Sequence, residues 1–136
     1  MIEIEYKSEF LEVSYDSGNS WVISKWTSNT SYLTVDQYKR EVEAARKVFI
    51  DHQPVFGNLS LNQDFYFVVD PEMQEWVNQQ FEEYLPSKSA IVVASEFVAQ
   101  LSIEQTVESM DVAICYFDNE QEAREWLTDQ TKASKV

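Results

Sequence analysis

The chain has 136 residues, of which 44% are hydrophobic and 14% aromatic, and its formal net charge is −14. This size and apolar content predict one globular domain over residues 1–136, with a core that needs neither a disulfide nor a metal ion. The acidic charge argues against nucleic acid and anionic lipid headgroups as partners. Two glycines, one histidine and one cysteine argue against a glycine-rich phosphate loop, a zinc site and a His-based nucleophilic triad.

The first 26 residues read as strands. Residues 11–15 alternate apolar with polar or smaller side chains, a turn cluster follows at 16–20, and residues 21–26 read as a second strand, which together predict a β-hairpin. Residues 2–6 alternate in the same way, and they either add a short edge strand or stay frayed. Trp21 and Trp26 have opposite parity on one strand, so we expect them on opposite faces of the sheet, one of them partly exposed.

A long helix is predicted from Thr34 to the stop at Pro54. Thr34 stands three residues before Gln37, which is the spacing of a capping box. Apolar side chains then recur at three- and four-residue steps along one face. His52 falls at the end of this helix, where we expect it to cap the helix or lie at the surface rather than to act in catalysis.

A strand over residues 55–61 is followed by an aromatic loop at 62–69. Asp70 and Pro71 form a helix start, with the aspartate as the N-cap and the proline in the first turn. Apolar residues continue at helical spacing to Tyr84, and Pro86 ends this second helix.

The last third predicts two further crossover units. Residues 90–94 and 112–117 are short apolar runs typical of strands buried on both faces, and Cys115 reads there as a small buried hydrophobe. Ser95 begins a helix that bends near Ser102. Asp118 or Asn119 caps a last helix, whose inward residues are Ala123, Trp126 and Leu127.

The predicted order of elements is therefore ββαβαβαβα. Strands that alternate with helices place the chain in the α/β class, with right-handed crossovers and a mainly parallel sheet. Because a hairpin opens the chain, the sheet is mixed, and we expect about five strands in a single domain. Residues 131–136 are expected to fray, as are residues 1–7 unless they add the edge strand.

This order, with residues 71–76 after an aromatic loop and residues 90–93 followed by 97–101, resembles the SpoIIAA-like superfamily. More narrowly, the chain is similar to the small stand-alone bacterial STAS- or Sec14-like proteins of that group. The resemblance covers about residues 8–130 and implies the fold and a role in protein contact or ligand binding. Members that act as anti-sigma-factor antagonists switch through a phosphorylated Ser or Thr in an Asp-Ser-Ser-Gly-like turn. The corresponding residues 62–67 contain no Ser, Thr or Gly, so we do not transfer that switch.

The strongest candidate for a binding surface is the aromatic run Phe65, Tyr66 and Phe67, together with Trp76, Phe81 and Asp64. Three consecutive aromatic residues in a loop either close over the core or form an apolar patch that binds something. Asp64 either caps a turn or lines that patch. Acidic pairs such as Glu104 and Glu108 lie on polar helix faces and lack a histidine, so they indicate solvated charge.

The leading hypothesis is a non-enzymatic binding or regulatory module that contacts another protein or a second copy of itself as a homodimer. The alternative, suggested by the Sec14-like comparison, is binding of a small apolar ligand between helices and sheet, for which a pocket of several hundred Å³ is required. An enzyme ranks last, and we expect no cofactor, because no convergent nucleophile, base and oxyanion donors can be named. The chain has no signal-peptide pattern and no apolar run long enough to span a membrane, so we expect a cytoplasmic protein.

Overall fold

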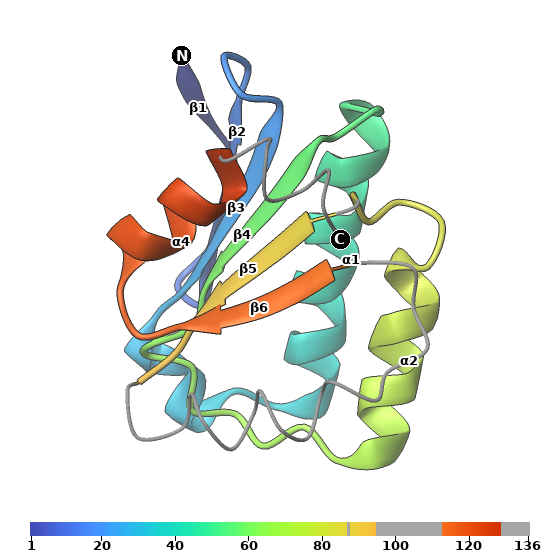
Figure 1. Cartoon of the computed structure of the whole chain (residues 1–136). Helices are drawn as coiled ribbons and strands as arrows, with labels where there is room; N and C mark the ends of the chain where they lie inside the picture. The colour runs from blue at the N-terminus through green and yellow to red at the C-terminus, as the bar shows by residue number, and fades with distance from the viewer. Residues whose placement is uncertain (87, 95–112, 129–136) are drawn as a thin grey trace.

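One mixed sheet of six strands organises the computed structural model, which describes residues 1–86, 88–94 and 113–128 (Figure 1). The strands lie side by side in chain order, with β1 to β3 antiparallel and β3 to β6 parallel. The predicted α/β class and mixed sheet are confirmed, with one strand more than expected because the N-terminal residues pair with β2. The strands are β1 (Ile2–Lys7), β2 (Leu11–Asp16), β3 (Trp21–Trp26), β4 (Gly57–Leu61), β5 (Lys88–Val92) and β6 (Ala113–Phe117).

The described helices cover both faces of this sheet. The short 3-10 helix η1 (Ser28–Tyr32) leads into α1 (Val35–Asp51), which packs on β1 to β3, and α2 (Pro71–Phe81) lies beside α1. The last helix, α4 (Glu120–Thr128), packs on β4 to β6 from the opposite face (Figure 1). Sequential parallel strands joined by crossovers of one hand place α1 and α2 on the same face. None of the described helices is both long and apolar enough to cross a bilayer.

The helix starts follow the predicted capping residues. The Thr34 hydroxyl accepts from the Gln37 backbone N–H, while the Gln37 side chain accepts from the Thr34 N–H, which completes the capping box. The Asp70 carboxylate accepts from the Met73 N–H at 2.8 Å. Of the two candidates before α4, the side chain of Asn119 is the one that accepts from the Glu122 N–H.

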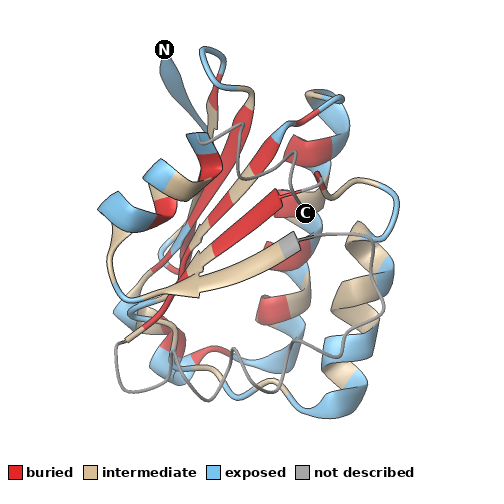
Figure 2. Ribbon diagram, in the orientation of Figure 1, coloured by how far each residue is buried: buried red, intermediate tan, exposed pale blue. Residues whose placement is uncertain are grey.

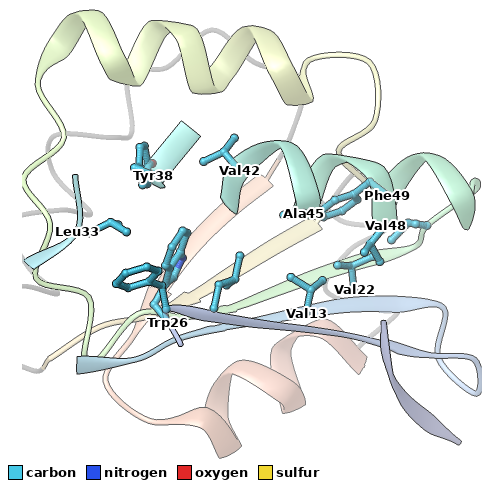
Figure 3. Close-up of a cluster of buried hydrophobic side chains, with 12 residues drawn as sticks. Val13, Val22, Trp26, Leu33, Tyr38, Val42, Ala45, Val48 and Phe49 are labelled. Atoms are coloured by element: carbon cyan, nitrogen blue, oxygen red, sulfur yellow. The ribbon is translucent and has the colours of Figure 1, made fainter. Parts of the chain in front are cut away.

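Two hydrophobic cores lie on the two faces of the sheet (Figure 2). Figure 3 shows the first, in which α1 side chains such as Val42 and Phe49 pack toward Val13 and Val22. Trp26 belongs to this core and Trp21 to the other, so their opposite orientation is confirmed. Neither is partly exposed, contrary to our expectation, because helices cover both faces. The second core contains Trp21, Ile23, Leu59, Leu61, Ala90, Val92, Ala123 and Leu127.

Several helices and strands begin or end at other residues than the sequence predicts. The strand expected over 55–61 begins at Gly57, and Phe56 is 66% exposed. The strand expected over 90–94 is β5, two residues earlier, and the helix expected to run to Tyr84 ends at Phe81. The helix expected from Ser95, its bend at Ser102 and the fraying of 131–136 lie outside the described residues.

Candidate functional site

A cavity of about 750 Å³ lies between the sheet and the helices α1 and α2, next to the segment 62–70 that connects β4 to α2. Its described lining comes from strands β2 to β6, from both helices and from the connecting segment. The volume falls within the range of roughly 300–1,000 Å³ that is typical of small-molecule sites.

The helix α2 stands over this cavity and packs against the core under α1 through side chains that are only partly buried. It carries Met73, Trp76, Val77 and Phe81 at helical spacing, yet none of its residues is fully buried (Figure 2). Val77 and Phe81 line the cavity, and the Phe81 ring meets the Phe49 ring of α1 edge to face at 5.5 Å between centroids. The apolar face of α2 therefore borders the cavity and contacts α1 at its edge.

The floor of the cavity is a row of polar side chains on three central strands. Asn58 and Ser60 of β4 line the cavity, whereas Leu59 between them belongs to the core under α4. The parallel register places Ser89 of β5 beside Asn58, and Ser24 of β3 beside Ser60. Central strands of a parallel sheet are normally apolar on both faces, so this polar row departs from what a packed core requires.

These polar side chains use only part of their hydrogen-bonding capacity. The Asn58 amide donates to the Ser89 hydroxyl at 3.3 Å, and the Ser60 hydroxyl donates to the Asn62 side-chain oxygen at 2.7 Å. Among the described residues, the Ser24 hydroxyl has no hydrogen-bond partner, and no side-chain oxygen or nitrogen there is both buried and unpartnered. The Ser24 hydroxyl is therefore accessible in the cavity that it lines.

Aromatic rings from three elements form the wall opposite α2. Trp26 at the end of β3 and Tyr38 of α1 stack at 5.7 Å between centroids. Phe65 lies 4.9 Å from Trp26, and Phe67 stacks on Tyr38 at 4.7 Å. All four rings line the cavity, where they offer flat apolar surface.

The segment 62–70 turns at residues 63–64, and exposure then alternates along residues 65–69, as in an extended chain. Phe65, Phe67 and Val69 are half-buried and pack against the core under α1, whereas Tyr66 and Val68 are exposed. Thr30 anchors the segment, because its buried hydroxyl accepts from the backbone N–H of Tyr66 at 2.9 Å. The segment therefore borders the cavity along residues 65–69, and its Tyr66 and Val68 side chains are also exposed to solvent.

The structure divides the six residues that the sequence singled out. Phe65, Phe67 and Phe81 come together at the cavity, and Tyr66 also lines it although its side chain is 55% exposed. Asp64 is exposed outside the lining. Trp76 also lies outside the lining, half-buried, with the Lys39 ammonium 5.3 Å from its ring centroid. The predicted set is thus part cavity wall and part surface.

The polar floor was not among the predicted residues, although a signal for it exists in the sequence. In the strand Gly57–Leu61, Asn58 and Ser60 alternate with glycine and leucine, and this pattern marks one polar face. The expectation that β5 is buried on both faces is wrong in part: Ala90 and Val92 pack under α4, whereas Ser89 and half-buried Ile91 line the cavity.

The described lining of the cavity carries no ionised side chain at neutral pH. The titratable side chains in this described lining are tyrosines, which are neutral at that pH. Burial raises the pKa of Tyr38 further, to about 12. A ligand in this cavity therefore meets neutral dipoles and aromatic faces, with no counter-charge from the described lining.

The burial of Tyr38 predicts a loss of stability in alkali. Between pH 10 and 12 the unfolded chain releases the Tyr38 proton while the folded chain keeps it, so the free energy of unfolding falls as the pH rises. The expected slope from this group is about 1.4 kcal/mol for each pH unit. Urea unfolding at several alkaline pH values should show a shallower decline for Tyr38→Phe, and an identical decline would contradict the assignment.

Titratable groups elsewhere have structural partners. Tyr6 and Ser8 donate hydroxyl hydrogen bonds to the buried Glu41 carboxylate, which ties the N-terminal strands to α1. Burial, followed by the hydrogen bond with Glu41, raises the pKa of Tyr6. His52 is the C-cap residue of α1, where its ring stacks on Tyr15 at 3.8 Å between centroids.

Cys115 is half-buried rather than fully buried, and burial raises the pKa of its thiol, which disfavours the reactive thiolate. Among the described residues, no three side chains of His, Cys, Asp or Glu are placed to hold a metal ion.

A second hollow of about 590 Å³ lies over the exposed face of α4. Its described lining comes from that one helix, and Arg124 and Glu120 within it already form an ion pair at 2.7 Å. An open helix surface whose charges pair with one another offers a ligand little enclosure, so we place the candidate site in the cavity under α2.

Comparison with known proteins gives no further assignment: no protein-family model, no curated protein and no solved structure matches this chain.

Proposed function

We propose that this protein is a non-catalytic binding protein that holds a small molecule in the cavity between the sheet and α2. One observation carries the proposal: a cavity of about 750 Å³ combines a polar floor at Asn58, Ser60 and Ser89 with aromatic walls. Apolar walls with a few convergent polar groups are the usual composition of a ligand site. We also propose the SpoIIAA-like assignment, which the sequential parallel strands after an antiparallel hairpin support.

A second function, contact with another protein or with a second copy of this chain, is favoured by the outer face of the segment 62–70. Tyr66 is 55% and Val68 86% exposed on that face. Exposed apolar side chains of this kind are common at protein interfaces. This function would use the exposed Tyr66 and Val68 side chains, which also border the cavity, whereas ligand binding would rest mainly on the half-buried Phe65 and Phe67 rings.

Two variants of the segment 62–70 test ligand binding in the cavity. Phe67→Ala removes the ring that stacks on Tyr38 in the cavity, and we expect binding of the neutral dye Nile red, followed by fluorescence, to weaken about tenfold. Asp64→Ala changes an exposed residue of the same segment that lies outside the lining, and it should leave dye binding unchanged. Circular dichroism would confirm that both variants fold.

The opposite pattern would count against the proposal. If the wild-type chain binds no Nile red, or if Phe67→Ala binds it as tightly as the wild type does, the cavity is not the binding site. Light scattering over a range of concentrations tests self-association, which Tyr66→Ala should weaken if the outer face makes the contact. A chain that stays strictly monomeric at high concentration would rule out the homodimer.

A further inference from the structure

The chemistry of the cavity lining restricts the class of ligand, an inference that rests on the proposed binding function. An anion would enter a site whose described lining holds no cation, in a chain of net charge −14. Burial of an unpaired charge is costly, and the acidic surface repels anions during their approach. Fatty acids, phosphates and other anions are therefore poor candidates.

A cation is disfavoured for a different reason. No carboxylate belongs to the described lining, and the aromatic rings mostly pack on one another. Trp26 and Tyr38 stack together, and Phe67 in turn stacks on Tyr38. A cation–π site requires ring faces that are open to the ligand. An apolar group can instead pack against ring edges and the aliphatic side chains of the lining, so this wall suits an apolar group better than an ammonium group.

The floor and the adjoining Asn62 supply hydrogen-bond donors and acceptors for an uncharged polar group. The side-chain amides of Asn58 and Asn62 each make one hydrogen bond among the described residues, although a carboxamide has two N–H donors and an acceptor oxygen. Ser89 accepts from Asn58, which leaves its own O–H free to donate. Donors and acceptors thus remain side by side along β4 and β5.

We infer that the ligand is an uncharged molecule with a flat apolar body and an amide-like edge that both donates and accepts hydrogen bonds. The edge lies on the floor at Asn58 and Ser89 and on the adjoining Asn62, which follows β4. The body extends between the aromatic wall and the Val77 and Phe81 side chains of α2. A ligand without the edge would leave the floor amides desolvated and unpaired, which lowers affinity.

Four probes of nearly the same shape test this class: para-phenylbenzamide, which is neutral, para-phenylbenzoate, which is anionic, para-phenylbenzamidine, which is cationic, and para-methylbiphenyl, which lacks a polar edge. We expect the benzamide to bind the full-length chain most tightly, with each of the others weaker by about tenfold or more. Titration followed by NMR or by tryptophan fluorescence would give the affinities.

Substitutions in and beside the floor test which residues cause the preference for the benzamide. Asn58→Leu should reduce the advantage of the benzamide over para-methylbiphenyl to about twofold or less, and Gln79→Leu, on the exposed side of α2 outside the lining, should preserve it. If Asn58→Leu does not fold, Asn62→Leu, which follows the end of β4, serves the same purpose.

Each result has a distinct meaning. If none of the four probes binds, the proposed binding function fails along with the inference. If all four bind with similar affinity, the cavity binds ligands but the inferred class is wrong. Tightest binding of the benzoate or of the benzamidine would overturn the inference in favour of an anionic or a cationic ligand. An unchanged preference in both floor variants would show that the edge does not lie on Asn58 and Asn62.

Discussion

Replacement of Val77 by tryptophan is expected to abolish Nile red binding without weakening the fold. Val77 is half-buried on α2 and lines the cavity, so a larger side chain there extends into the space of about 750 Å³. Overpacking normally destabilises a core, but only where no free volume can accept the added atoms. We expect dye affinity to fall more than about tenfold, with the free energy of unfolding unchanged or raised by about 1 kcal/mol.

Val35→Trp is the matched control, because Val35 is half-exposed at the start of α1 and lies outside the cavity lining. This variant should bind Nile red as the wild type does. If both variants bind the dye equally well, the dye sits elsewhere. If Val77→Trp loses stability by more than about 2 kcal/mol, the side chain has no room and the cavity is smaller than we describe.

Local signals in the sequence predicted the elements of the fold. The Thr34 and Gln37 pair, and the Asp70 and Pro71 pair, mark helix starts because backbone donors there need a partner whatever the tertiary contacts. Alternating strands and helices then restrict the sheet to a few topologies, of which the mixed α/β sheet is the one observed. The hairpin at 11–26 follows from its turn cluster in the same way.

Local patterns in the sequence could not predict the cavity, because its volume depends on how far α2 stands from the sheet. An apolar stripe such as that of Val77 and Phe81 has the same spacing whether it faces a packed core or an open space. The aromatic residues of the segment 62–70 were recognised by their composition. Which of them face inward follows from the alternation between Phe65 and Val69, and that pattern becomes informative only once the segment is known to be extended.

The polar floor has a cost in stability that can be measured. Asn58 and Ser89 lie on a sheet face that would be apolar in a fully packed α/β domain, and they satisfy each other through one hydrogen bond of 3.3 Å. Removal of both partners of such a bond is nearly neutral or stabilising, whereas removal of one leaves the other without its partner. Residues kept for binding often lower stability in this way.

The double variant Asn58→Val with Ser89→Ala is therefore expected to be more stable than the wild type by about 1 kcal/mol. Urea unfolding followed by tryptophan fluorescence gives this difference, provided that the dependence on urea concentration is unchanged. The single variants complete a double-mutant cycle that isolates the pair, and each should gain less than the double variant does.

The same double variant should lose the preference for para-phenylbenzamide over para-methylbiphenyl, since it keeps the aromatic wall but lacks the pair on the floor. Stability and selectivity would then change in opposite directions, which a purely structural role for the pair does not produce. If the double variant is instead destabilised by about 1 kcal/mol or more, Asn58 and Ser89 hold β4 and β5 together. In that case the reason for polar side chains on this face is the sheet itself and not a ligand.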